Sequence, residues 1–216
     1  MFADGLITLL HLLVFVYWLG GDIGAFYAST YLTRADVPLE RRLFAAKMLN
    51  DIDMAPRTAI ILAFPTGFSV ALAKGWIEAP IVLAATFFVV AFFWLSVVWR
   101  LHSQAPSQAL GRMDSFIRWT ALIALLAYSL GGMIGAVALP LFITLKCAAL
   151  AVAIGCGLAI RRVASPLGGA LASLATGDDA TASLAIRSVM SKARPLVIAI
   201  WLTLIFAAYL GLVTPT

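Results

Sequence analysis

The chain has 216 residues, of which 63% are hydrophobic and 12% charged, and its mean hydropathy is +1.03. These values exclude a soluble domain and are typical of a membrane protein built from several helices. The formal net charge is +5, and the charged residues are confined to a few short segments. This charge indicates membrane topology and contact with anionic lipid, with no nucleic-acid partner expected.

Hydropathy predicts six membrane-spanning helices, at residues 5–32, 54–73, 77–99, 116–134, 141–160 and 195–213. A helix needs about 20 apolar residues to cross a bilayer. The apolar sequence from 116 to 160 is too long for one crossing, and three glycines and Pro140 predict a turn within it. We therefore expect an all-α fold, a polytopic six-helix transmembrane bundle that forms a single domain over residues 1–216.

The first span contains two ionisable residues, His11 and Asp22. Eleven positions separate them, which brings them to within about 20° of the same helix face, and Trp18 falls on that stripe too. Ionisable groups at bilayer depth are costly and are candidates for functional roles. The structural alternatives are that His11 donates a hydrogen bond to a neighbouring helix and that Asp22 pairs with an arginine.

Proline and polar residues predict interruptions between and within the spans. Residues 34–53 predict a helix along the membrane surface, and so do residues 183–193. Pro65, near the middle of the second span, predicts a kink or a local opening, because proline donates no backbone hydrogen bond. Pro195 is expected to open the sixth span.

The distribution of basic residues predicts the orientation. Thirteen of the fifteen lysines and arginines fall in or beside three loops on one side of the predicted bundle. The opposite side receives only Lys74, and Lys146 lies inside the fifth span. The positive-inside rule then places both termini outside the cytoplasm.

This topology assigns depths to the polar side chains. His11 and Lys146 lie about equally far below the outer ends of their helices, and Met133 lies at the outer end of the fourth span. We expect these three residues to share an outer-leaflet site. Asp22 lies deeper, where Arg57 enters the second span, so the two are expected to form a buried charge pair.

Depth also bears on which haem ligation is possible. His102 is expected at the cytoplasmic surface, most of the membrane thickness of about 30 Å away from His11. A haem held by two histidines of one chain is therefore not expected. A site with one histidine remains, with Lys146 as second ligand or propionate partner, or Met133 as axial thioether. The alternative for Lys146 is that its ammonium reaches the outer interface.

Three segments resemble a known family. His11-Leu-Leu-x5-Trp18-Leu-Gly-Gly and Leu145-Lys146-Cys-Ala-Ala-Leu-Ala-Val-Ala-Ile-Gly-Cys-Gly-Leu-Ala-Ile-Arg-Arg resemble the copper-resistance D family, and the final span is similar to that family's C-terminus. The same order of histidine and lysine occurs in the haem-dependent bacterial protoporphyrinogen oxidase and in the membrane domain of bacterial urate oxidase. The resemblance implies that His11 is an axial or metal ligand and that Lys146 belongs to its site. Residues 79–135 have no counterpart in it.

Three functions follow as hypotheses. The first is a multi-pass bacterial inner-membrane protein that binds haem b and transfers electrons or oxidises a small molecule, with quinone or a redox protein as partner. The second is copper transport or resistance, since Met133, Cys147 and His11 offer ligands that suit Cu(I). The third is a structural anchor subunit of a larger homo- or hetero-oligomer. Whether the protein is an oxidoreductase, or a subunit of one, is left open by the sequence.

Overall fold

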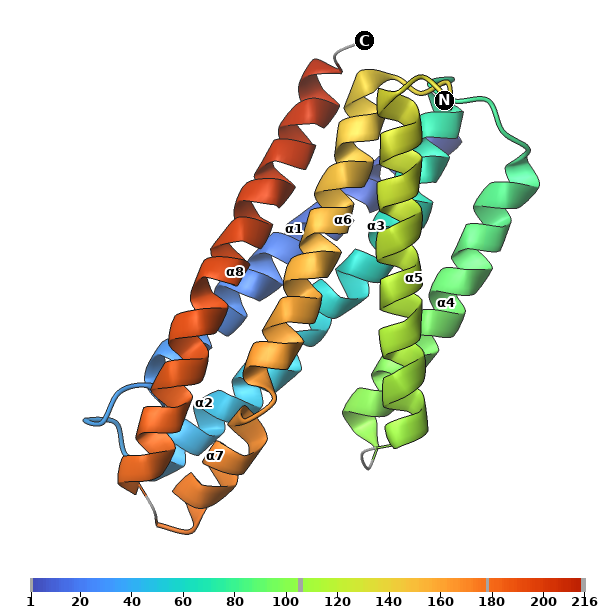
Figure 1. Cartoon of the computed structure of the whole chain (residues 1–216). Coiled ribbons are helices and arrows are strands. Elements are labelled where there is room, and N and C mark those ends of the chain that lie inside the picture. Colours follow the sequence, from blue (N-terminus) through green and yellow to red (C-terminus); the bar gives the residue numbers. More distant parts are fainter. Residues whose placement is uncertain (1, 105–106, 178, 215–216) are drawn as a thin grey trace.

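The computed structural model describes residues 2–104, 107–177 and 179–214. These residues form helices and no strand (Figure 1): α1 (Phe2–Leu32), α2 (Leu39–Ile52), α3 (Met54–Ala73), α4 (Ile81–Ser103), α5 (Gln108–Met133), α6 (Leu141–Ala164), α7 (Leu167–Ala175) and α8 (Asp179–Val213). Within the described ranges, six helical segments are long and apolar enough to cross a membrane. The predicted all-α class with six membrane spans is confirmed.

The helices of the first, second and fifth predicted spans, α1, α3 and α6, begin and end close to the predicted positions. The helices of the third and fourth spans, α4 and α5, begin at other residues than predicted. α4 begins after Pro80, later than the predicted start at residue 77. α5 begins at Gln108, eight residues before the predicted start at 116. Its N-cap is Ser107, whose hydroxyl accepts a hydrogen bond from the Leu110 amide at 3.4 Å. The polar first turns of α5 were missed because hydropathy detects apolar stretches, not helix.

The two prolines within helices do not interrupt them. α3 runs through Pro65, and α8 runs without a break through Pro195. The helix that contains the sixth span therefore begins before Pro195, and the start of the membrane span at Pro195 stays a prediction. The first half of α8 is held by packing: Ile186 is fully buried, and Val189 packs in the same cluster. This tertiary packing outweighs the local cost of a proline in the helix.

The six long helices form a ring. Each one contacts the next in the order α1, α3, α4, α5, α6 and α8, and α8 closes the ring on α1. The main core lies inside this ring and receives buried side chains from all six helices, including Trp18, Trp94 and Cys147. The bundle can therefore hold interior polar groups away from lipid.

A second, smaller core joins the last residue of α1 to α2, α7 and the first half of α8. Arg42 of α2 is only 2% exposed within it. Its guanidinium donates to the Leu32 carbonyl at 3.2 Å and to the Ser183 hydroxyl at 2.7 Å. Both segments contain helix as expected, in α2 and in the first half of α8, and their placement along the membrane surface stays a prediction. Arg42 ties the two segments together.

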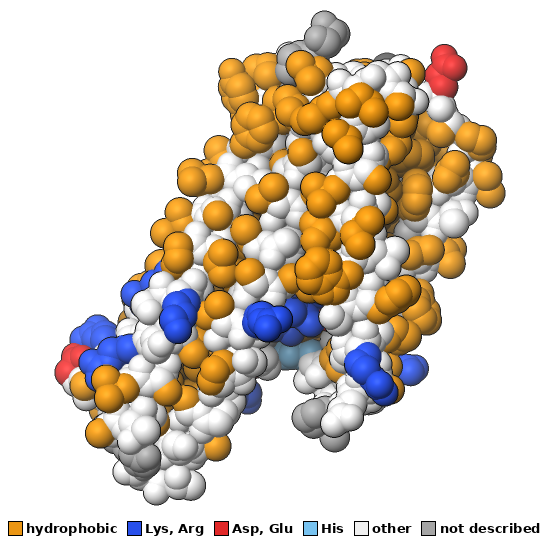
Figure 2. All heavy atoms as spheres, viewed as in Figure 1, with side chains coloured by type: hydrophobic (Ala, Val, Ile, Leu, Met, Phe, Trp, Pro, Cys, Tyr) orange, Lys and Arg blue, Asp and Glu red, His pale blue; other side chains and the backbone are white. Residues whose placement is uncertain are grey.

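The two ends of the bundle differ in charge. Figure 1 shows both chain ends at the same end of the bundle, which we call the terminal end. On the face drawn in Figure 2, the lysine and arginine side chains gather toward the opposite end, which we call the basic end. The molecule therefore has two distinct ends along its long axis, one with the chain termini and one rich in lysine and arginine.

Candidate functional site

The His11 ring is held by α3 in a defined orientation. Its Nδ1 lies 2.9 Å from the Thr66 hydroxyl oxygen, and that hydroxyl lies 2.6 Å from the Leu62 carbonyl. A hydroxyl has one proton, and the Leu62 carbonyl can only accept it, so Nδ1–H of His11 is the donor to Thr66. The neutral ring then carries its lone pair on Nε2. Nε2 makes no hydrogen bond to any residue that the structure describes.

Gly67 provides the surface against which the ring packs. A Cβ atom at this position would lie 3.0 Å from His11 Cε1 and 3.5 Å from Nε2. The Pro65-Thr66-Gly67 segment, which the sequence suggested only as a kink, therefore positions the histidine. Thr66 accepts its hydrogen bond, and Gly67 leaves space for its edge.

Lys146 lies close enough to His11 to interact with it electrostatically. It is half-buried on α6. A Cβ atom on Gly211 of α8 would lie 2.7 Å from its ammonium nitrogen, so the absence of a side chain there leaves space for the ammonium. No carboxylate in the described part of the chain forms an ion pair with Lys146. The site thus combines an imidazole lone pair with an ammonium group that has no counter-ion among the described residues.

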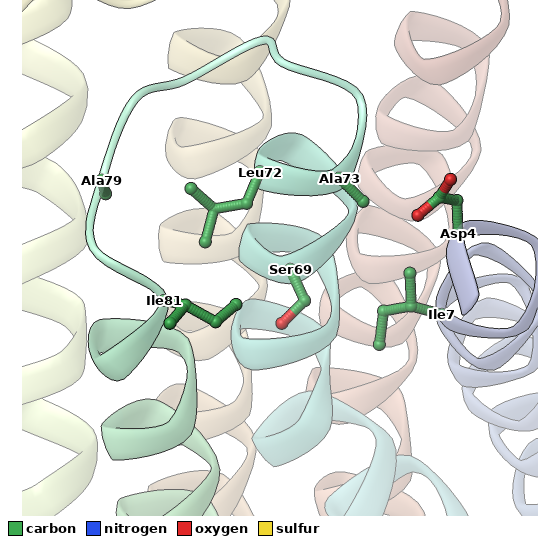
Figure 3. A pocket seen from close by; sticks show the side chains of 7 residues that line it. All are labelled: Asp4, Ile7, Ser69, Leu72, Ala73, Ala79 and Ile81. Atoms are coloured by element: carbon green, nitrogen blue, oxygen red, sulfur yellow. The ribbon is translucent and has the colours of Figure 1, made fainter. Parts of the chain in front are cut away.

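A pocket opens at the terminal end beside this site. It has a volume of about 500 Å³ and is lined by Asp4, Ile7, Ser69, Leu72, Ala73, Ala79 and Ile81. In Figure 3, α1 residues stand on one side, the start of α4 on the other and α3 residues between them. Ile7 precedes His11 by four residues and therefore lies one turn away on the same face of α1. The pocket therefore shares α1 and α3 with the His11 site and lies nearer the terminal end.

The other two residues predicted for the outer site lie in different surroundings. Trp18 is 3% exposed and belongs to the main core, two turns deeper along α1 than His11. Met133 ends α5 with 55% of its surface exposed. This exposure gives no support to Met133 as an axial ligand, and its predicted role stays a prediction.

The predicted ion pair between Asp22 and Arg57 does not form. Arg57 instead binds Asp53, the N-cap residue of α3 four positions earlier, with Nε 2.6 Å from the carboxylate. One carboxyl oxygen of Asp22 is buried without a hydrogen-bond partner. The prediction failed because an aspartate four residues before an arginine on the same helix is a closer partner than one on another helix.

A charge cluster that the sequence analysis missed joins α4, α5 and α6. Asp114 is fully buried and accepts hydrogen bonds from Trp94 Nε1 at 2.8 Å and Arg118 Nε at 3.1 Å. Arg161 of α6 contacts the same carboxylate at 2.6 Å. The spacing of Asp114 and Arg118, four residues apart on one helix, was a signal for half of this cluster. The link to Arg161 is a long-range contact that no local pattern indicates.

The described part of the chain contains no group of three or more histidine, cysteine, aspartate or glutamate side chains that could hold a metal ion. Cys147, suggested as a copper ligand, is 7% exposed and packs in the main core. No protein-family model, curated protein or solved structure matches the chain. The resemblance to the copper-resistance D family therefore stays a prediction, which rests on the three segments that carry it.

Proposed function

We propose that this protein is a haem-b-binding protein of the bacterial inner membrane, with His11 as the axial ligand, and that it acts in electron transfer or in the oxidation of a small molecule. The observation that carries the proposal is the state of the His11 ring. Its Nδ1–H is held by Thr66, and its Nε2 lone pair is left without a hydrogen bond. This is the arrangement of an imidazole prepared to bind a metal, since ligating histidines usually donate their other nitrogen to a fixed partner.

The donor chemistry of the residues fits haem. One neutral imidazole on one side is a common axial ligation of haem iron. Lys146 has no carboxylate partner in the described residues. Its ammonium would pair with a haem propionate, or its neutral amine, after loss of a proton, would serve as a second ligand. Haem would supply a one-electron redox centre. The chain's own part is to orient the imidazole through Thr66 and Gly67 and to hold a positive charge close to the ring.

The pocket at the terminal end supports access for a small partner molecule. Ile7 and Leu72 give it apolar walls, while Asp4 and Ser69 add polar groups. A quinone, which carries an apolar ring with carbonyl oxygens, suits such a lining, and a redox protein could approach from the same end. With thirteen of fifteen basic residues in or beside the opposite loops, the positive-inside rule puts this end outside the cytoplasm.

The visible absorption spectrum of the purified protein tests the proposal. A Soret band that shifts on reduction with dithionite is expected, because only a bound macrocycle gives such a band. Copper in stoichiometric amount without a Soret band would contradict haem binding and favour the copper hypothesis. A colourless, metal-free preparation from cells supplied with haem precursor would also contradict the proposal and favour a structural anchor subunit.

A further inference from the structure

A second cavity lies at the basic end, far along the bundle from His11. It has a volume of about 360 Å³ and is lined by Arg57 of α3, Val98 and Leu101 of α4, Gly111 of α5, and Arg161 and Ala164 of α6. We call it the basic cleft. Figure 2 shows a hollow at this end between two arms of the bundle, with lysine or arginine and histidine side chains inside it. Few contacts join α4 to α5, and α4 reaches α2 through His102, which lies 3.6 Å from the Asp51 carboxylate.

The charges around the basic cleft do not balance. Three guanidinium groups lie close together here. Arg161 is within electrostatic range of both Arg57 and Arg118, and Arg118 binds Asp114. Two carboxylates oppose them: Asp53 binds Arg57, and Asp114 binds the other two arginines. Among these five groups, the guanidinium groups outnumber the carboxylates three to two, and Arg118 and Arg161 share the single carboxylate of Asp114. Asp22 lies within electrostatic range of Asp53 and forms no ion pair with these arginines in the described residues.

The remaining donors are available to a ligand. Both oxygens of Asp114 are occupied, one by Trp94 and one by the two arginines. Arg161 contacts Asp114 through one terminal nitrogen, and 37% of its side-chain surface is exposed. The Arg57 side chain is 34% exposed. Arg118 also has a terminal nitrogen without a hydrogen-bond partner in the described residues, but this nitrogen is buried and Arg118 does not line the cavity. Arginine donors in excess over acceptors are what a phosphate group requires.

We propose that the basic cleft binds a phosphate-bearing anion through Arg57 and Arg161, which reach it from α3 and α6. Val98, Leu101 and Ala164 form the apolar part of the wall. A ligand that satisfies both parts has a phosphate group next to an apolar portion, as an anionic phospholipid does. Free phosphate compounds offer the same charged group without the apolar portion, so the two sources can be separated by experiment.

The test measures binding to the purified full-length protein in a non-ionic detergent by microscale thermophoresis. The probes are dihexanoyl phosphatidylglycerol, dihexanoyl phosphatidylcholine and inorganic phosphate. The variants are Arg57→Gln and Arg161→Gln, each compared with Arg162→Gln. Arg162 is the exposed neighbour of Arg161 and does not line the cavity, so Arg162→Gln removes the same charge from the same end.

Phosphatidylglycerol is expected to bind at least about tenfold more tightly than phosphatidylcholine. Arg57→Gln and Arg161→Gln should each weaken this binding about tenfold, and Arg162→Gln should leave it within about twofold. Should Arg161→Gln fail to fold, because it leaves Asp114 with one arginine fewer, Arg57→Gln still carries the test. If inorganic phosphate displaces phosphatidylglycerol at equal concentration, the ligand is a free phosphate compound, and if it does not, the ligand is a lipid. Equal binding of both lipids, or an equal loss in all three variants, would overturn the proposal.

Discussion

The Asp114 carboxylate is fully buried, and the groups that surround it come from three different helices. Trp94 donates from α4, Arg118 from α5 and Arg161 from α6. The Arg118 guanidinium also lies 5.2 Å from the centre of the Trp94 ring, close enough for a cation–π contact. At the residue scale this cluster is the polar feature on which the packing of α4, α5 and α6 depends most.

Replacement of Asp114 by asparagine should therefore destabilise the protein. Breaking a buried ion pair by removing one partner costs about 3–5 kcal/mol, because the other charge stays buried without compensation. Unfolding of purified Asp114→Asn in a mixture of detergent and SDS measures the loss. The control is Asp51→Asn, where the carboxylate is exposed and lies 3.6 Å from His102. A change under about 0.5 kcal/mol is expected there. Equal stability of the two variants would contradict the assignment.

Asp22 should respond in the opposite way. One of its carboxyl oxygens is buried without a partner, and Arg57 is bound to Asp53. Asp22→Asn removes an ionisable group that gains nothing from an ion pair, so the variant should be as stable as the wild type or more stable. A double-mutant cycle with Arg57→Gln should give a coupling energy below about 0.5 kcal/mol. A coupling energy of about 2 kcal/mol or more, typical of a buried pair, would instead support an ion pair between the two residues.

At the scale of elements, α1 and α3 approach each other closely at Gly21. A Cβ atom there would lie 2.6 Å from Pro56 Cδ and 2.9 Å from Ala55 Cβ. Neither atom belongs to a flexible side chain, so an added methyl group would force the two helices apart. Small residues at such crossings are what membrane helices use to pack closely.

The alanine variants of the two adjacent glycines form a matched pair. Gly21→Ala should cost about 1–3 kcal/mol through overpacking at the contact with α3. Gly20→Ala meets no atom within 4 Å, and should be neutral or stabilising by up to about 1 kcal/mol, because alanine is the better helix former. Thermal unfolding of both variants, followed by circular dichroism in detergent, measures the difference. Similar melting temperatures would mean that the α1–α3 crossing is looser than described.

The helices that could be predicted from the sequence are those marked by a long run of apolar residues. α1, α3 and α6 follow the predicted spans closely. In each of them the continuous apolar run has nearly the same ends as the helix, and it is long enough to cross a bilayer. The start of α5 and the continuity of α8 could not be predicted. Both depend on contacts made by polar or proline-containing sequence, at Ser107 and around Ile186, which hydropathy does not report.

At the scale of the whole molecule, the arrangement of charge gives a testable orientation. Both chain ends lie at one end of the bundle, and lysine and arginine gather toward the other. Alkaline phosphatase fused to the C-terminus should therefore be active, because the enzyme needs the oxidising exterior. Green fluorescent protein at the same position should stay dark when exported unfolded. A fusion at residue 104, in the loop between α4 and α5, should show the reverse pattern, and bright fluorescence at the C-terminus would contradict the orientation.

The candidate site could be predicted from the sequence only in its ionisable members. His11 and Lys146 stand out because ionisable residues are rare within apolar spans. Thr66 and Gly67 carry no such signal, since threonine and glycine are ordinary in membrane helices, and their role depends on the register of α3 against α1. For the same reason the partner of Asp22 was predicted wrongly. Depth along a helix follows from counting residues, whereas the direction of a side chain toward a given neighbour depends on tertiary packing.

The most direct test of the central claim compares haem content in wild type, His11→Ala and His102→Ala. All three are purified from the same haem-supplied cells, and the Soret absorbance is divided by the protein concentration. His102 lies at the basic end beside Asp51, so its variant should retain the wild-type ratio. His11→Ala should lose the band almost completely, while its membrane insertion and helical circular dichroism stay unchanged. A wild-type ratio in the His11 variant, or equal losses in both histidine variants, would contradict the account.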